Sequence, residues 1–324
     1  MAKRTFLLGM AVALSFGLSA CISIGEGETR NFAKDFTVTG PVTLDLQNGS
    51  GDITITAGGD GRVKVRGEVR MQEFLFEVGS RRRIEDVVAK PPITQTGDVL
   101  RFVRPQSDGP RSIRIHYTIE APAKTEIRVR NSSGDVSITG VAGPLSINTS
   151  SGDIVVANIQ ERVDVSAGSG DITARQIRGA LIATARSGDL ELDDISGEIR
   201  AQTGSGDIRI DNARGKVSAE ASSGEITIDG VPADLRVQTG SGDVRIVGDP
   251  AANALWEIET RSGRAELDVS NRASFQLAAR SRSDIDSDIE MTIEERSRRS
   301  LRGRVGKGDA RVRIDTGSGH IRVH

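Results

Sequence analysis

The tripeptide Ser-Gly-Asp recurs at one constant spacing through the middle of this chain. Seven copies, one of them Ser-Gly-Glu, follow each other at intervals of 18 residues. They begin at Ser133, Ser151, Ser169, Ser187, Ser205, Ser223 and Ser241. Such a constant interval is typical of a chain that winds into stacked, nearly identical coils. Related tripeptides at Ser50, Ser262 and Ser318 lie outside this rhythm.

Apolar and polar residues alternate within each unit, on both sides of the tripeptide. The third position is aliphatic in every unit between Thr125 and Pro250: Ile127, Leu145, Val163, Leu181, Ile199, Val217 and Leu235. A period of two residues indicates strands rather than helices. The glycine-containing tripeptide between the two alternating runs indicates a bend. Each unit therefore predicts a strand, a bend, a second strand and a turn.

Strands this short cannot bury their faces alone, but equivalent strands of stacked units can pair in parallel and in register. We therefore predict an all-β fold, a parallel β-helix (β-solenoid) of two-strand coils with irregular capping coils at both ends. About 12 coils at about 4.8 Å each would make a rod roughly 60 Å long. A β-propeller or a β-sandwich is the alternative, although these folds need longer repeats or irregular spacing. Aromatic residues make up only 3% of the chain, which suits a thin aliphatic core.

The rhythm is regular over residues 125–250 and lost on either side. We expect irregular N-terminal coils and a cap over residues 35–124. Within them Arg83–Lys90 is the best candidate for a helix, because the prolines at 91 and 92 would end it. We expect atypical coils over residues 251–324, with Trp256 and Phe275 as large core fillers. The arginine-rich segment 291–308 is interpreted as an exposed loop.

The first 20 residues have the pattern of a lipoprotein signal peptide. Lys3 and Arg4 precede an apolar run, Phe6–Leu18, that is too short to span a bilayer. Small residues before Cys21, the single cysteine, resemble a lipobox, which implies cleavage before this residue and its acylation. Residues 21–34 would then form a tether. An ordinary secretory signal is the alternative. We expect a lipid-anchored protein of the cell envelope, at the outer membrane in a Gram-negative cell, whose membrane contact is the acylated N-terminus.

The third residue of the tripeptide aligns carboxylates one coil apart: Asp135, Asp153, Asp171, Asp189, Asp207, Glu225 and Asp243. Such a ladder repels itself unless it is compensated. One hypothesis is a calcium ladder, because Ca²⁺ prefers oxygen ligands. The other is that each side chain caps its own bend by accepting hydrogen bonds from local N–H groups. The nonapeptide rhythm of calcium-binding β-rolls is missing, so we favour capping and expect no metal or other cofactor.

Charge and residue usage argue against two functional classes. The chain has 43 basic and 45 acidic residues and a net charge of −2, whereas a nucleic-acid-binding protein needs a basic footprint. Glycan-active enzymes on β-helices need paired carboxylates in one groove, but here the acidic residues are spread along one edge. His116, His320 and His324 are isolated in the sequence. We therefore expect no enzymatic activity. The basic segment 291–308 is interpreted as solvated, with contact to anionic lipid or lipopolysaccharide as the alternative.

Together these features resemble the bacterial adhesin-like β-strand-repeat family, whose domain has no assigned function. The resemblance rests on the lipoprotein signal, the Ser-Gly-Asp-Ile or Ser-Gly-Asp-Val repeats and the final coil Thr316–Ile321, and it covers roughly residues 35–324. Arg264 and His320 depart from the pattern at Asp positions. The resemblance implies a parallel β-helix, an envelope location and an adhesive or scaffolding role, and it transfers no catalytic residues.

The leading hypothesis is accordingly a non-enzymatic, lipid-anchored scaffold or adhesin. Its partner would be an envelope protein, peptidoglycan or another glycan. The alternatives are a glycan-active enzyme on the same fold and an accessory protein in envelope-stress signalling.

Overall fold

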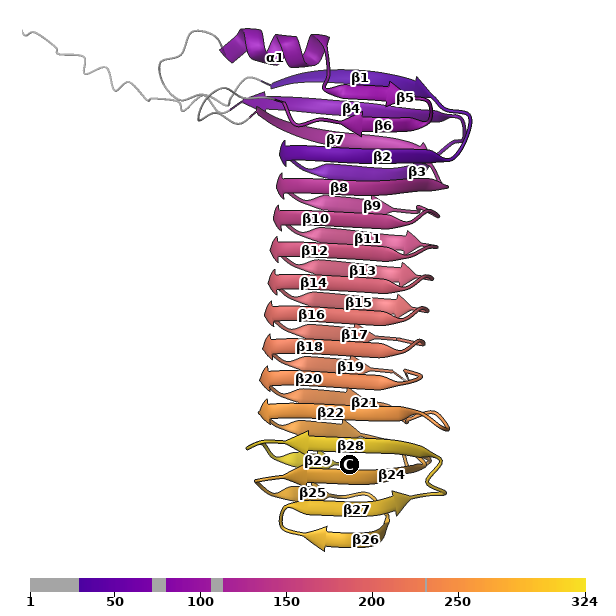
Figure 1. Cartoon of the computed structure of the whole chain (residues 1–324), viewed down its shortest axis with the longest axis vertical. Helices are drawn as coiled ribbons and strands as arrows, with labels where there is room; N and C mark the ends of the chain where they lie inside the picture. Colours follow the sequence, from indigo (N-terminus) through magenta and orange to yellow (C-terminus); the bar gives the residue numbers. More distant parts are fainter. Residues whose placement is uncertain (1–28, 72–79, 106–112, 231) are drawn as a thin grey trace, which may run out of the picture.

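Two long sheets lie one behind the other along the length of the molecule (Figure 1). The computed structural model describes residues 29–71, 80–105, 113–230 and 232–324. Sheet A has 14 strands and sheet B has 15. In spatial order, sheet A consists of β1 (Thr29–Thr37), β4 (Arg62–Met71), β7 (Ile113–Pro122), β3 (Ile53–Gly58), β9 (Val136–Thr139), β11 (Ile154–Ile159), β13 (Ile172–Ile177), β15 (Leu190–Ile195), β17 (Ile208–Asp211), β19 (Ile226–Asp229), β21 (Val244–Val247), β23 (Ala265–Asp268), β29 (Ile321–Val323) and β25 (Ile285–Ser287).

In spatial order, starting from the C-terminal end, sheet B consists of β26 (Thr292–Ser297), β27 (Ser300–Val305), β24 (Phe275–Ser281), β28 (Ala310–Thr316), β22 (Leu255–Ser262), β20 (Leu235–Ser241), β18 (Val217–Ser223), β16 (Ile199–Ser205), β14 (Leu181–Ser187), β12 (Val163–Ser169), β10 (Leu145–Ser151), β8 (Thr125–Ser133), β2 (Val42–Ser50), β6 (Val99–Phe102) and β5 (Ile93–Thr96). From β8 to β21, each turn of the chain contributes one strand to each sheet.

Equivalent strands of successive units pair in parallel at the spacing of the repeat. Leu145 of β10 pairs with Val163 of β12, which pairs with Leu181 of β14. The predicted β-solenoid is therefore confirmed, and the propeller and sandwich alternatives are wrong. At about 4.8 Å between neighbouring strands, the stack is roughly 60 Å long.

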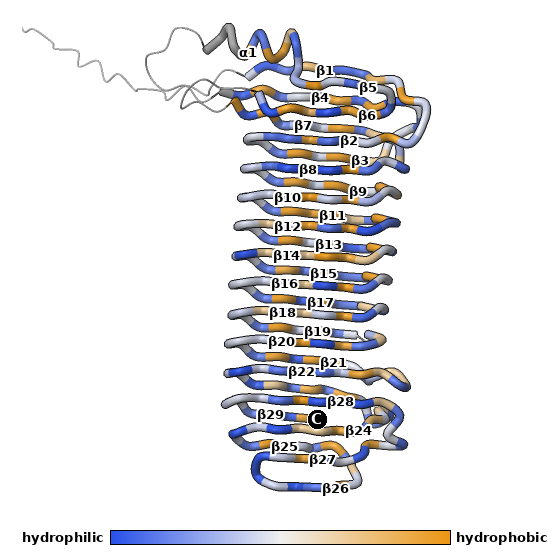
Figure 2. The backbone as a smooth tube through the Cα atoms, viewed as in Figure 1, coloured by the Kyte–Doolittle hydropathy of each residue, from blue (hydrophilic) through white to orange (hydrophobic). Residues whose placement is uncertain are grey.

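The core is a continuous layer of aliphatic side chains between the sheets. The alternating hydrophobic and hydrophilic stretches of each strand repeat from coil to coil in Figure 2. Val163, Leu181 and Ile199 are fully buried. Burial of each such side chain contributes about 1.5–3 kcal/mol, so the stack is stabilised by the sum of many equivalent layers.

Strands at the N-terminal end do not stack in chain order. The coil formed by β2 and β3 lies against β8 and β9, whereas β6 and β7 lie on its far side. Strand β4 runs antiparallel to both β1 and β7, so this part of residues 35–124 does not form a coil of the solenoid. The predicted helix is present as α1 (Ser80–Ala89), which lies over β1 and β4 and buries Ile84. No described helix is long and apolar enough to cross a membrane.

The C-terminal end has the same departure from chain order. The last strands of the chain, β28 and β29, are inserted between β22–β23 and β24–β25. Trp256 and Phe275 are fully buried there, as predicted. The interpretation of residues 291–308 as a loop is wrong, because β26 and β27 form an antiparallel hairpin. The reason lies in the period-two burial of Leu301, Gly303 and Val305, which the intervening exposed arginines mask in the sequence.

Candidate functional site

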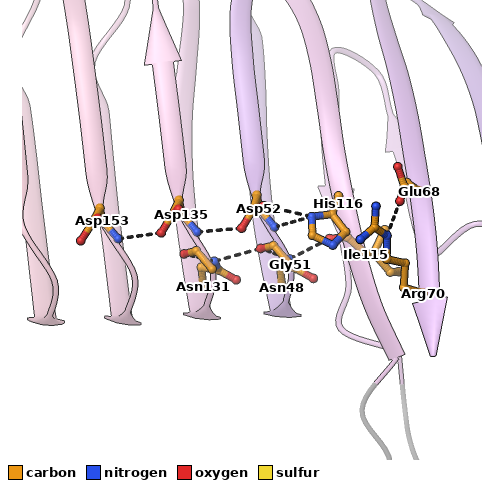
Figure 3. A network of polar contacts seen from close by, with 11 residues as sticks. Asn48, Gly51, Asp52, Glu68, Arg70, Ile115, His116, Asn131, Asp135 and Asp153 are labelled. Carbon is orange, nitrogen blue, oxygen red and sulfur yellow. Dashed lines mark hydrogen bonds and ion pairs between the residues drawn. The ribbon is translucent and has the colours of Figure 1, made fainter. Parts of the chain in front are cut away.

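The Ser-Gly-Asp tripeptides stack along one edge of the solenoid, where a strand of sheet B bends into the next strand of sheet A. There the N–H of Asp153 donates to Oδ1 of Asp135 over 2.9 Å (Figure 3). One coil further on, the N–H of Asp171 donates to Oδ1 of Asp153 over 2.9 Å. We call these residues the carboxylate column: Asp52, Asp135, Asp153, Asp171, Asp189, Asp207, Glu225 and Asp243. The same bond joins every step from Asp52 to Glu225, at 2.7–3.0 Å.

These bonds correct the expectation that each carboxylate caps its own bend. Each aspartate of the column caps the bend of the following coil, because parallel in-register stacking places that coil's N–H beside it. A hydrogen bond to an ionised carboxylate is favourable and offsets part of the repulsion along the column. Within the described residues, no three His, Cys, Asp or Glu side chains are grouped so that they could hold a metal ion. The calcium ladder stays a prediction for titration.

The column is interrupted once, at its single glutamate. Over the part of the chain that the structure describes, the N–H of Asp243 forms no hydrogen bond with Glu225. The longer Glu225 side chain instead accepts a hydrogen bond from the Thr227 hydroxyl at 3.1 Å. The pattern resumes where the N–H of Arg264 donates to Oδ1 of Asp243 over 2.7 Å. The register of the next coils then places Arg264, His320 and Asp284 at successive steps of the edge.

The first step of the column involves a histidine from the N-terminal cap. Nδ1 of His116, on β7, lies 3.1 Å from Oδ2 of Asp52 and 3.3 Å from its backbone nitrogen. The buried amides of Asn48 and Asn131 lie directly inside this step (Figure 3). Both Nδ2 groups donate to the carbonyl oxygen of Gly51, at 3.1 and 3.2 Å. The cap is thus joined to the first regular coil by side-chain hydrogen bonds as well as by the sheets.

Glycine in the tripeptide is required by the close approach of successive bends. Gly170 has a φ of 135°, in the region that side chains rarely adopt. A Cβ atom there would lie 2.2 Å from the carbonyl oxygen of Gly152, the equivalent residue of the preceding coil. No flexible group can move aside, because the obstacle is backbone.

A column of buried hydroxyls, which the sequence reading missed, lies at the seventh position of the units. Thr149, Thr203 and Thr239 are buried there. The Thr203 hydroxyl donates to the carbonyl oxygen of Gly188 over 3.0 Å, and that of Thr239 donates to Gly224 over 3.4 Å. These bonds satisfy carbonyl groups of the bends inside the core. Threonines interspersed with alanines at this inward position of the repeat could have indicated the column from the sequence.

Each of the three histidines, isolated in the sequence, lies close to one carboxylate in the structure. His116 meets Asp52, Nε2 of His320 lies 3.0 Å from Oδ2 of Asp286, and Nε2 of His324 lies 2.8 Å from Oε1 of Glu266. Neighbouring coils bring these pairs together across 34 to 64 residues of sequence. The separation of these residues along the sequence gave no indication that the pairs would form.

A charged groove lies at the C-terminal end of sheet A. Its volume is about 860 Å³, and its lining is charged: Arg264, Glu266, Asp286, Ser287, Asp288, Arg296, His320 and Arg322. Partial burial raises the pKa of Glu266, but its contacts with His324 and Arg245 outweigh this effect and hold the pKa below its ordinary value. Asp288 is paired with Arg322 at 3.5 Å. In the described part of the chain, Arg264 and Arg296 have no carboxylate partner and face the groove as free guanidinium groups.

The lipidation residue, Cys21, lies outside the described residues, so its acylation stays a prediction. The exposed arginines of the hairpin lie on β26 (Arg296), in the β26–β27 turn (Arg298 and Arg299) and on the outward side of β27 (Arg302 and Arg304). The structure therefore assembles the carboxylate column that the sequence predicted, and adds the histidine pairs and the C-terminal groove.

Comparison with known proteins identifies a family. The profile of the Toastrack DUF4097 family matches residues 111–248 and, in a second overlapping match, residues 180–324. No curated protein matches the chain. Solved structures that are similar include a candidate adhesin from Bacteroides fragilis NCTC 9343, at 16% identity and a TM-score of 0.44, covering 67% of this chain and 97% of that one. Another is a candidate cell adhesion protein from Clostridium sporogenes ATCC 15579, at 11% identity and a TM-score of 0.26, covering 91% of this chain and 99% of that one.

Proposed function

Since the chain belongs to the Toastrack DUF4097 family, we propose that it is a non-enzymatic, lipid-anchored protein of the cell envelope that acts as an adhesin-type interaction scaffold. The observation that carries this proposal is the contrast between a uniform core and a varied surface on the same strands. A rigid rod of this kind presents an extended surface whose chemistry differs at every coil.

Sheet B illustrates this contrast. The inward third position of its coils is aliphatic throughout, and all seven residues are buried. The outward fourth position carries unlike side chains at the same geometry: Arg128, Ser146, Asp164, Ile182, Arg200, Ser218 and Arg236. Parallel pairing spaces these side chains about 4.8 Å apart along the rod. Such a surface suits an extended partner, which we propose to be a glycan, peptidoglycan or an envelope protein.

The anchor is tested by replacing Cys21 with Ser in the full chain. Cells grown with an alkyne fatty acid should label the parent protein and not the Cys21→Ser variant, and the variant should leave the membrane fraction. Persistent labelling of the variant would contradict anchoring through Cys21.

The scaffold role is tested by photo-crosslinking in intact cells. A photoreactive residue at Ser146, Ile182 or Ser218, all outward on sheet B, should capture a defined partner. The same residue at the exposed bend position Ser205 serves as the control for surface exposure alone. Absence of a discrete crosslinked product from every outward position would contradict the scaffold role, and release of soluble fragments from peptidoglycan or glycan by purified protein would contradict the non-enzymatic assignment.

A further inference from the structure

Arginines gather on the outward face of sheet B at its C-terminal end. They lie on three adjacent strands, β28, β24 and β27, and we call them the arginine face: Arg280, Arg302, Arg304, Arg311 and Arg313. All five are exposed. The arrangement is set by backbone register rather than by side-chain freedom, because the inward partners of these strands are buried in the core.

The register places four of the five at the corners of a rectangle. Gln276 of β24 pairs with Arg311 on one side and Arg304 on the other. Ala278, two residues further on, pairs in the same way with Arg313 and Arg302. Alternate residues of a strand are about 7 Å apart, and strands on either side of a common neighbour are about 10 Å apart. The short Ala278 side chain lies between Arg313 and Arg302, on one side of this rectangle.

Acidic neighbours neutralise only part of the arginine face. Arg313 is paired with Asp315 at 2.5 Å and also lies near Glu257 and Glu259 of β22. Arg302 approaches Glu295 at 3.7 Å, and the register places Asp315 beside Arg280. In the described part of the molecule, Arg280, Arg304 and Arg311 have no ion-pair partner. On the rest of the same sheet, Arg128 is paired with Glu126, Arg200 with Glu198 at 3.3 Å, and Arg236 with Glu257 at 3.7 Å. Among the described residues, Arg186 of β14 and Arg261 of β22 are exposed without an ion pair. The unpaired arginines are therefore most concentrated on the last strands, where Arg280, Arg304 and Arg311 lie on three adjacent strands.

An exposed apolar side chain continues one row of this face. Leu255 of β22 pairs with Arg311 and is 44% exposed. The row thus runs Leu255, Arg311, Gln276, Arg304 on one flat surface. Basic residues beside an exposed aliphatic side chain are the combination that binds the interface of an anionic bilayer, where the charge meets headgroups and the apolar group enters the acyl boundary.

We propose that the arginine face docks onto a bilayer that carries anionic phosphate headgroups. The face supplies unpaired guanidinium groups, which bind phosphate oxygens through charge-assisted hydrogen bonds. Leu255 favours a bilayer over a dissolved polyanion, because a dissolved polyanion offers no apolar phase for this side chain. The proposal is independent of the anchor proposed at Cys21.

The test measures binding of the full chain to vesicles, with Cys21→Ser in every variant so that no acyl chain contributes. The measured quantity is the ratio of affinities for phosphatidylcholine vesicles with and without phosphatidylglycerol, which cancels any contact that does not depend on headgroup charge. The test variant is Arg280→Gln/Arg304→Gln/Arg311→Gln. The matched control is Arg128→Gln/Arg200→Gln/Arg236→Gln, which changes the net charge equally on the same sheet. Far-UV circular dichroism and melting verify that both remain folded.

Each basic residue near an anionic surface strengthens binding by about fivefold, so the test variant should lose about 100-fold of the parent's preference for phosphatidylglycerol. The control should lose less than about threefold, and about 0.5 M salt should abolish the preference of the parent. Equal loss in both variants would overturn the proposal in favour of net charge alone. It would also be overturned if the parent showed no preference for anionic vesicles, or if the arginine face bound only a soluble anionic polysaccharide.

Discussion

One type of hydrogen bond recurs along the edge of the solenoid. In it, the N–H of one bend donates to the carboxylate of the bend before it. Aspartate is the side chain that reaches this N–H, since the longer Glu225 turns to Thr227 instead. The bond satisfies a backbone donor at an exposed bend, in the same way that an aspartate caps a helix. The repeated tripeptide therefore has a structural explanation at every step except the one after Glu225.

Removal of one carboxylate separates capping from metal binding. Asp171→Ala removes the acceptor of the Asp189 N–H and should cost about 1 kcal/mol of unfolding free energy. Asp171→Asn keeps an oxygen acceptor and removes a like charge, so it should cost less than about 0.5 kcal/mol. Urea unfolding measures both. A rise in Tm of many degrees with sub-millimolar calcium, lost in both variants, would instead support the calcium ladder.

The bend glycines provide a second prediction. Gly170→Ala should destabilise the protein by about 2–4 kcal/mol, because the new Cβ meets backbone and the φ is unfavourable. Gly59→Ala is the control, since its Cβ has no atom within 4 Å. Thermal unfolding compares the two. A loss in Gly170→Ala no larger than in the control would show that the stack can separate at this bend.

Acid sensitivity follows from Asp234. The N–H of Leu255 and the Lys216 side chain hold the pKa of Asp234 below its ordinary value of 3.8. Because the folded-state pKa is the lower one, the stabilisation is present above about pH 3.8 and is lost as the pH falls through the folded-state pKa. Tm should therefore fall more steeply with acid in the parent than in Asp234→Asn. Asp60→Asn, at an exposed turn, should follow the parent, and identical acid profiles for all three would contradict this assignment.

The strands at the two ends of the rod do not stack in the order in which they follow each other in the sequence. The strands β28 and β29 complete the stack only because they lie between coils that precede them in the sequence. Trp256, the only tryptophan, depends on this insertion, since its neighbour in the sheet is Val312 of β28. The sequence predicted atypical coils over residues 251–324, but it contained no information on which strand each of their strands would join.

Truncation tests this insertion. Deletion of residues 310–324 should expose Trp256 and shift its emission to longer wavelength, because the strand beside it is missing. In a solenoid that stacked in chain order, the same deletion would remove only an outer coil. Deletion of residues 181–198 removes a similar length far from Trp256 and serves as the control. Unchanged emission after the C-terminal truncation would contradict the observed strand order.

The whole molecule behaves as a stack in which each coil contacts only its neighbours. Such a stack tolerates loss of one complete repeat but not of a fraction of one. After removal of residues 181–198, Ile199 would pair with Val163 and Asp207 would follow Asp171 in the column. Arg175 would then face Asp211, so an arginine would still lie opposite an aspartate at this position.

Deletion of residues 181–198 should therefore yield a folded protein with one cooperative transition and a Tm lowered by about 5 °C or less. Deletion of residues 181–189 should prevent folding, because it places a sheet A strand where a sheet B strand belongs. Far-UV circular dichroism and melting distinguish the two. Equal tolerance of both deletions would contradict the two-sheet register.

The sequence by itself determined the coil, the register and the carboxylate column, because a strict repeat makes every local interaction recur at the same distance along the chain. Burial of Leu145, Val163 and Leu181 follows from that period alone. Only the tertiary structure decided the order of the strands at both ends, the histidine–carboxylate pairs and the arginine face. These features depend on contacts between segments that are not separated by a constant number of residues. The period of the repeat therefore does not specify which strands pair there.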